Sequence, residues 1–272
     1  MSNIVIEVNN VSMRFNLTKD KITGLKEYVV KMLKRQIEYE EFWALKNVSF
    51  SVEKGEIFGV VGLNGAGKST LLKIISGVFK PTKGSIKMTG DLVPLLELGT
   101  GFDPEFSARD NIYMNGAMYG RSPREMDGIF NEIMDFAELW EFKDVTLKNF
   151  STGMAARLGF AVATSVKPDI LIIDEIFGVG DYKFQEKCSA RIKGMISGGT
   201  TALLVSHDID LIRQMCKRAI LLEKGNAVCL GTADEVAEIY GDRGRLAKII
   251  DELNKEEIQN KDPTLISSEK VS

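Results

Sequence analysis

The sequence predicts an α/β fold built on a largely parallel β-sheet. Three short apolar runs, ILIID (170–174), TALLVS (201–206) and AILLE (219–223), alternate with segments that have helical spacing. An earlier run, IFGVVG (57–62), is apolar throughout, as expected of a strand that is buried on both faces. Such alternation of strands and helices is typical of a parallel sheet covered by helices.

Other segments add to this core. The runs at 4–8 (IVIEV) and 44–52 (ALKNVSFSV) predict two N-terminal strands, which we expect to be antiparallel. Between about residues 103 and 168 the sequence is methionine-rich and helix-like, which predicts a helical subdomain inserted into the core. TADE (232–235) is a capping box that opens a short helix. Residues 246–272 are expected to form a polar C-terminal tail.

Composition narrows the class of protein. The 272 residues are 44% hydrophobic and carry a net charge of −3, so the basic excess of a protein that coats nucleic acid is missing. Cys188, Cys216 and Cys229 are too widely spaced to predict a disulfide framework or a zinc site. The opening residues do not resemble a secretory signal, and no apolar run approaches the ~20 residues that span a bilayer. We expect an intracellular protein whose membrane role needs a partner.

A glycine-rich segment between the strand at 57–62 and a helix expected over 71–79 matches the phosphate-loop pattern G-x-x-x-x-G-K-[ST]. Its glycines let backbone N–H groups approach phosphate oxygens, and the helix that follows adds the positive end of its dipole. Lys68 is predicted to neutralise the β- and γ-phosphates, and the Ser69 hydroxyl to bind Mg²⁺. The segment therefore predicts a site for ATP and Mg²⁺. It consists of Gly62, Leu63, Asn64, Gly65, Ala66, Gly67, Lys68, Ser69 and Thr70.

Two acids and the single histidine follow the ends of later strands. Asp174 and Glu175 close the run at 170–174, and His207 follows the run at 201–206. In a parallel sheet these ends share one edge. Asp174 is then predicted to hold magnesium through water, Glu175 to polarise the attacking water, and His207 to hydrogen-bond the γ-phosphate or that water. Alone, the acids would be ordinary helix N-terminal charges and the histidine a surface or core residue, but the phosphate loop favours the catalytic interpretation.

The stretch FSTGM (150–154) opens an amphipathic helix, and its Ser151 and Gly153 form a second candidate anion site far along the chain from the phosphate loop. Together with the phosphate loop, the acid pair, Asp181 and His207, this stretch resembles the nucleotide-binding domain of ABC transporters over residues 4–240.

The resemblance implies a P-loop NTPase domain with a RecA-like core over residues 1–245. It also implies a homodimer in which each of two ATP molecules lies between the phosphate loop of one subunit and the helix that starts at Ser151 and Gly153 in the other. Asp181 then resembles the acid that couples the two sites.

Three stretches, 95–116, 150–164 and 174–181, are similar to the ATP-binding subunits of exporters for lipid-linked polysaccharides, namely O-antigen, capsule and wall teichoic acid. This similarity implies an ATP hydrolase at the cytoplasmic face of the cell membrane. Its partner would be a separate polytopic permease that carries the lipid-linked glycan, with no nucleic acid involved. The alternatives are a soluble ABC-type ATPase and a transporter subunit for a different substrate.

The glutamine position and the adenine platform are among the departures from the family pattern. Glu97 and Leu98 stand where most ABC subunits have a glutamine that contacts magnesium and the membrane partner. At the adenine platform, Phe15 matches the usual aromatic without a tyrosine hydroxyl. The alternative is a core role for Phe15, and Trp43 is a second candidate for the adenine contact.

A basic insertion at about 19–36 separates the first two strands. Residues 19–35 carry a net charge of +4, and Ile22, Leu25, Val29 and Leu33 recur at helical spacing. We therefore expect an amphipathic helix that contacts anionic lipid headgroups, the permease or its own domain.

Overall fold

The computed structural model describes residues 3–18, 39–95, 99, 101–174 and 180–259. The chain divides into two compact units, which we describe one at a time. The phosphate-loop unit comprises residues 6–52, 60–88 and 207–272, and the helical unit comprises 1–5, 53–59 and 89–206. The residues of strand β3 (Ile57–Val61) are divided between them.

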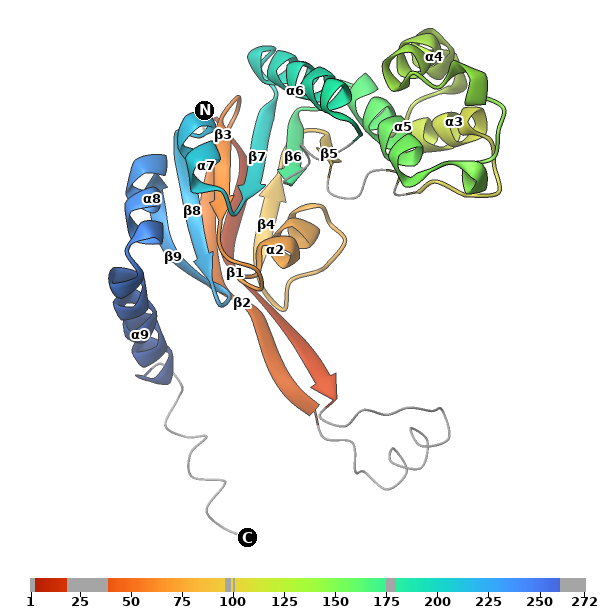
Figure 1. Ribbon diagram of the computed structural model, residues 1–272. Helices are drawn as coiled ribbons and strands as arrows, with labels where there is room; N and C mark the ends of the chain where they lie inside the picture. The colour runs from red at the N-terminus through yellow and green to blue at the C-terminus, as the bar shows by residue number, and fades with distance from the viewer. Residues whose placement is uncertain (1–2, 19–38, 96–98, 100, 175–179, 260–272) are drawn as a thin grey trace, which may run out of the picture. The chain divides into compact units, whose positions relative to one another are not determined.

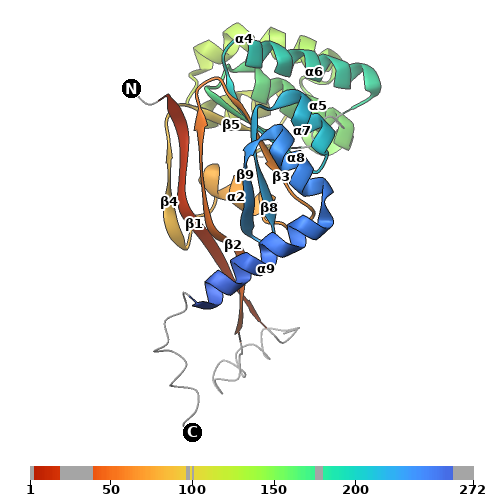
Figure 2. The same ribbon diagram turned by 90° about the vertical axis from the view of Figure 1, so that its left-hand side faces the viewer.

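The phosphate-loop unit contains strands of both directions. Its strand order is β4-β1-β2-β9-β8 (Figure 2). The pairs β1–β4 and β8–β9 are antiparallel, whereas β2–β9 is parallel. The strands are β1 (Ile4–Thr18), β2 (Tyr39–Glu53), β4 (Lys83–Met88), β8 (Arg218–Glu223) and β9 (Asn226–Thr232).

The first two strands are longer than the runs at 4–8 and 44–52 predict. Both have 15 residues and continue together as a two-stranded arm toward residues 19–38 (Figure 1). In the arm the side chains become exposed, for example Leu17 at 50% and Phe42 at 50%. The residues of the arm have no buried face. They stay extended because each strand is hydrogen-bonded to its neighbour.

Four helices belong to this unit: α2 (Lys68–Ile75), α7 (Ile209–Met215), α8 (Ala233–Gly241) and α9 (Arg243–Gln259). Helix α2 ends before the predicted 79, because Gly77 takes a φ of +75° and Val78 and Phe79 both donate to Lys73 O. Helix α8 opens with the predicted capping box of Thr232 and Glu235. Part of the expected polar tail is helix α9, and Leu246 there is 5% exposed.

The helical unit holds the parallel strands β5 (Leu92–Pro94), β6 (Ile170–Asp174) and β7 (Thr201–Ser206), in the order β7-β6-β5. Its helices are α3 (Ala108–Met118), α4 (Pro123–Ala137), α5 (Thr152–Ser165) and α6 (Tyr182–Ser197), with short 3₁₀ turns at Trp140–Phe142 and Leu147–Asn149. Helices α3, α4 and α5 occupy the stretch predicted to be a helical subdomain (Figure 1).

An aromatic cluster joins three of these helices. Phe136 of α4 stacks on Phe160 of α5 with ring centroids 5.7 Å apart, and Phe184 of α6 meets both rings edge-on. All three side chains are buried. Since each buried aromatic ring removes 150–250 Å² of surface from water, the cluster fixes α4, α5 and α6 against one another. Parallel and antiparallel strands with covering helices confirm the predicted α/β class.

Candidate nucleotide-binding site

The phosphate loop lies between β3 and α2. Gly67 is the N-cap of α2 and has a φ of +107°. The Lys68 ammonium nitrogen Nζ donates to Gly62 O at 2.7 Å and to Leu63 O at 3.2 Å, and Lys68 is 9% exposed. A positive charge is thus held inside the loop at the N-terminal end of a helix, where charge and helix dipole both favour a phosphate group.

The glycines show that the loop is tight on one side and open on the other. A Cβ on Gly62 would lie 2.4 Å from Leu222 O, and one on Gly67 would lie 2.6 Å from Ala44 O. A Cβ on Gly65 would meet no atom within 4 Å. The loop therefore packs closely against the neighbouring backbone while its other side can accept phosphate oxygens.

We expect Gly67→Ala to lower the free energy of unfolding more than Gly65→Ala does. Both glycines have a positive φ, so either alanine costs about 1–2 kcal/mol in backbone strain. In Gly67→Ala the new Cβ also overlaps Ala44 O, which costs about 1–3 kcal/mol more, whereas in Gly65→Ala it meets no atom. Urea denaturation of the two variants measures this difference, and equal losses would contradict the packing described for the loop.

The predicted catalytic acids and histidine follow strands β6 and β7. Asp174 is the last residue of β6 and pairs with Val205 of the parallel strand β7, whereas Glu175 lies outside the described residues. His207 follows the end of β7 and is exposed. Its carbonyl oxygen accepts a hydrogen bond from the Tyr240 hydroxyl at 3.3 Å. Asp174 and His207 therefore stand at strand ends, as the sequence predicts.

The second predicted anion site is a helix start in the helical unit. Ser151 is the N-cap of α5, and its Oγ accepts a hydrogen bond from Met154 N at 3.1 Å. Gly153 is the second residue of the helix, and a Cβ there would have only Ser151 Oγ nearby, at 3.8 Å. Ser151 is exposed and Gly153 half-buried, so this helix start is accessible to a partner molecule.

Asp181 begins a helix in the same unit. It is the N-cap of α6, and its Oδ1 accepts a hydrogen bond from Phe184 N at 3.0 Å. This hydrogen bond and the nearby Arg157 guanidinium lower the pKa of Asp181, so the carboxylate stays ionised at neutral pH.

The two candidate adenine contacts lie in different surroundings of the phosphate-loop unit. Phe15 is half-buried and meets Phe79 edge-on, with ring centroids 5.9 Å apart. Trp43 is half-buried with two cations near its ring, the Arg14 guanidinium at 5.8 Å from the centroid and the Lys83 ammonium at 5.6 Å. Phe15 stays our predicted adenine contact.

Besides Glu175, two further sequence predictions fall outside the described residues. The first concerns Glu97 and Leu98, which stand where most ABC subunits have a glutamine. The second is the basic insertion at 19–36. Both stay predictions.

Comparison with known proteins identifies the family. A model described as ABC transporter matches residues 45–178. The chain is 44% identical to ABC transporter protein AbcA of Aeromonas salmonicida over 88% of its own length and 77% of that protein's. It is 40% identical to the O-antigen export system ATP-binding protein RfbB of Klebsiella pneumoniae, covering 87% of this chain and 97% of that one. The chain belongs to the ABC transporter ATP-binding family.

Other matches agree with the assignment of this chain to the ABC transporter ATP-binding family. The teichoic acids export ATP-binding protein TagH of Listeria monocytogenes is 37% identical over 88% of this chain and 70% of that protein. Among solved structures, the dimeric post-hydrolysis state of the ATP-binding cassette MJ0796 bound to ADP and Pi matches with a TM-score of 0.66 and 23% identity, covering 84% of this chain and 98% of that one. That likeness supports the same fold. Among the described helices, none is both long enough and apolar enough to cross a membrane.

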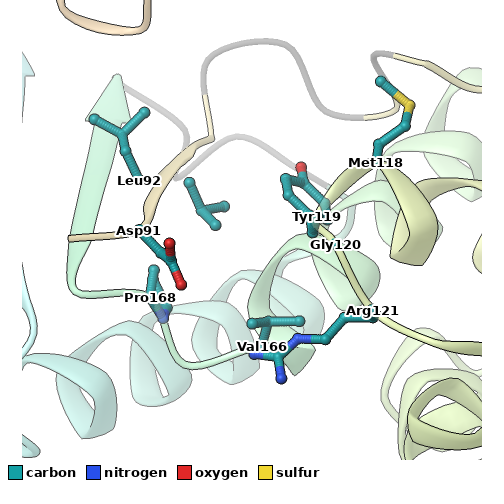
Figure 3. A pocket seen from close by; sticks show the side chains of 9 residues that line it. Asp91, Leu92, Met118, Tyr119, Gly120, Arg121, Val166 and Pro168 are labelled. Carbon is teal, nitrogen blue, oxygen red and sulfur yellow. The ribbon is translucent and has the colours of Figure 1, made fainter.

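The helical unit of this ABC ATPase also contains a pocket of about 400 Å³ that sequence reasoning missed (Figure 3). It lies between β5, the C-terminal end of α3 and the turn before β6. Asp91, Tyr119 and Arg121 supply its polar groups, and Met118 and Pro168 are among its apolar ones. Burial raises the pKa of Tyr119, so its hydroxyl stays protonated and able to donate. Because the lining residues are up to 77 positions apart, sequence gave no signal for the pocket.

Proposed function

We propose that this ABC ATPase hydrolyses ATP to drive export of a lipid-linked polysaccharide or teichoic acid through a separate transmembrane permease. The proposal rests mainly on the phosphate loop, in which Lys68 is held by two carbonyl oxygens. It also rests on the similarity of 87% of the chain to an O-antigen export ATP-binding protein. The match to a teichoic acids export protein supports the same class of cargo, a polymer carried on a lipid.

ATP binds through the loop of residues 62–70. Lys68 leaves the carbonyl oxygens of Gly62 and Leu63 to contact the β- and γ-phosphates, which offer stronger, charged acceptors. Backbone N–H groups at the start of α2 and the helix dipole add to this attraction. Phe15 contacts the adenine.

The residues at the loop also fit Mg²⁺. Ser69 lies in the first turn of α2 beside Lys68 and is exposed, so its hydroxyl oxygen is available to a hard cation. Asp174, at the end of β6, would supply a carboxylate to hold the ion through water. When bound, Mg²⁺ neutralises charge on the phosphates.

Hydrolysis needs a general base and a second subunit. Glu175 polarises the attacking water, and His207 hydrogen-bonds the γ-phosphate. In the homodimer, the helix start with Ser151 and Gly153 closes over the nucleotide of the other subunit, and Asp181 couples the two sites. Dimer formation thereby completes each nucleotide site.

The permease contact is made at the cytoplasmic face of the membrane by the helical unit. The pocket described above has both charged and apolar lining, which suits an amphipathic segment of a partner protein. Its lining residues Leu92 and Val93 precede residues 97–106 in the chain, the stretch that we predict to be the root of the permease contact.

We expect Arg121→Glu to reduce co-purification of the permease and export, while ATP hydrolysis by the isolated chain stays near the parental rate. Arg121 lines the pocket, and among the described residues it pairs with Glu125 in an exposed i,i+4 contact at 3.4 Å, worth about 0.2–0.5 kcal/mol. The fold should therefore tolerate the change. Arg124→Glu, an exposed neighbour that does not line the pocket, is the matched control. Equal co-purification by both variants would contradict the contact.

The function itself is tested in cells. Removal of the chain should abolish one surface glycan polymer, and the parental chain should restore it. The tagged chain should be isolated from detergent-solubilised membranes together with a polytopic protein. An unchanged surface polymer profile, or isolation with ribosomes or nucleic acid instead of membrane protein, would contradict the proposal.

A further inference from the structure

Arg157 connects α5, the helix that begins after Ser151, to the start of α6. It lies on α5, six residues after the N-cap Ser151, and its side chain is 20% exposed. Its Nη2 donates to Asp181 Oδ2 at 2.5 Å, while its guanidinium carbon lies 4.7 Å from the centroid of the Phe184 ring. Its Nη1 is 3.6 Å from Glu138 Oε2. One guanidinium therefore contacts residues at the start of α6 and at the end of α4.

The turn before α6 is shaped to accept this guanidinium. Gly180 has a φ of +75°, and a Cβ there would lie 3.3 Å from Arg157 Nε and 3.1 Å from the Phe184 ring. Asp181 uses one carboxylate oxygen to cap α6 and the other to bind Arg157. Since the carboxylate has both roles, the position of Arg157 and the conformation of this turn depend on each other.

We propose that Arg157 is a positioning residue that holds the helix start of Ser151 and Gly153 and the turn at Asp181 in one fixed arrangement. This inference rests on the proposed homodimer. Both segments are accessible in the single chain, and in the dimer both must meet the other subunit's nucleotide site. Fixing them beforehand removes the entropy cost of ordering them separately on association, so the dimer forms at a lower ATP concentration.

The contacts of α6 elsewhere show that Arg157 is not needed simply to attach the helix. Lys187 Nζ donates to Phe136 O at 2.9 Å, which caps the C-terminal end of α4. Arg191 donates to Thr164 O at 3.2 Å and pairs with Glu132. The guanidinium of Arg191 also stacks on Phe136, 4.4 Å from the ring centroid. These residues hold α6 to α4 and α5 without touching the turn at Asp181.

Arg191 is therefore a matched control for Arg157. Both are arginines of the same unit with side chains 20% exposed, and each combines an ion pair with a stacked aromatic ring. Only Arg157 reaches Asp181. Replacing either one with lysine keeps the charge but removes the planar, forked donor that makes these contacts.

The test uses the full chain carrying Glu175→Gln, in which ATP should drive dimerisation without being consumed. We compare Arg157→Lys, Arg191→Lys and Asp181→Asn in that background by analytical ultracentrifugation over a range of ATP concentrations. Arg157→Lys should raise the ATP concentration for half-maximal dimerisation about tenfold, and Arg191→Lys should leave it within about twofold. Binding of a fluorescent ATP analogue to dilute monomer should be unchanged in both variants, because the phosphate loop is intact.

A double variant completes the test. If Arg157 acts through Asp181, then Arg157→Lys combined with Asp181→Asn should shift the midpoint no further than the larger single change. The inference would be overturned if the two substitutions raised the ATP midpoint independently, so that their fold-changes multiplied. It would also be overturned if Arg157→Lys had the same midpoint as the Glu175→Gln chain. Neither result would contradict the dimer itself. A loss of monomer ATP binding in Arg157→Lys would also overturn it, because that result indicates general damage to the fold. A Glu175→Gln chain that stays monomeric with ATP would instead contradict the proposed dimer.

Discussion

Replacing Glu175 with glutamine should leave ATP binding intact and lower the turnover of ATP by ~10²-fold or more. The substitution keeps the size and hydrogen-bonding capacity of the side chain but removes the carboxylate that accepts a proton from the attacking water. A hundredfold loss corresponds to about 2.7 kcal/mol of transition-state stabilisation. Phosphate release from ATP and the binding of a fluorescent ATP analogue measure the two effects separately.

The same variant should also form a stable dimer with ATP. If hydrolysis is what opens the proposed dimer, a chain that binds but does not hydrolyse ATP stays closed, and gel filtration with ATP should show twice the monomer mass. ADP should give monomer, which serves as the control. Parental turnover by Glu175→Gln would refute the assignment of the base, and an active parental enzyme whose variant never dimerises would refute the shared site.

Replacing Lys68 with alanine should abolish ATP binding itself. In the loop, the Lys68 ammonium donates hydrogen bonds to the carbonyl oxygens of Gly62 and Leu63. Its positive charge therefore lies in the loop before ATP binds. Without it, the β- and γ-phosphate charges face only backbone N–H groups and the dipole of α2. We expect no measurable ATP hydrolysis and no dimerisation with ATP.

Thermal unfolding separates loss of binding from loss of fold in this variant. A ligand at 100 times its dissociation constant stabilises a protein by about 2.7 kcal/mol, which raises the parental melting temperature when ATP is added. The Lys68→Ala chain should unfold cooperatively, and its melting temperature should not respond to ATP. An ATP-dependent rise equal to the parental one would contradict the role of Lys68. Glu175→Gln, which should keep the full rise, is the matched control.

Local patterns predicted much of this molecule correctly because their physical causes are local. The phosphate loop needs only a strand, three glycines and a helix start in direct succession, and the structure has Gly67 as the N-cap of α2. The capping box of Thr232 and Glu235 and the cap at Ser151 likewise depend on residues three positions apart. In each case a side chain satisfies a nearby backbone N–H, so the sequence contains all the participants.

The misjudged elements depend on neighbours that are distant in sequence. Strand β1 extends beyond the predicted residue 8 to Thr18 because adjacent strands hold it extended. Strands β5 and β9 lack a strong apolar run, and their pairing with β6 and β8 defines them. A three-residue strand ending in proline has no intrinsic signal, since its stability comes from its partner.

For this protein, the sequence by itself determined the phosphate loop and the helix caps, because spacing along the chain fixes glycine turns and caps, and the ABC ATPase class came from its resemblance to that family. Only the tertiary structure decided which distant groups meet. The ion pair of Arg157 with Asp181 joins residues 24 positions apart, and the pocket brings Asp91 near Arg121 and Pro168. Such contacts arise when helices pack around a shared aromatic core, and packing depends on three-dimensional complementarity rather than on any repeat or motif.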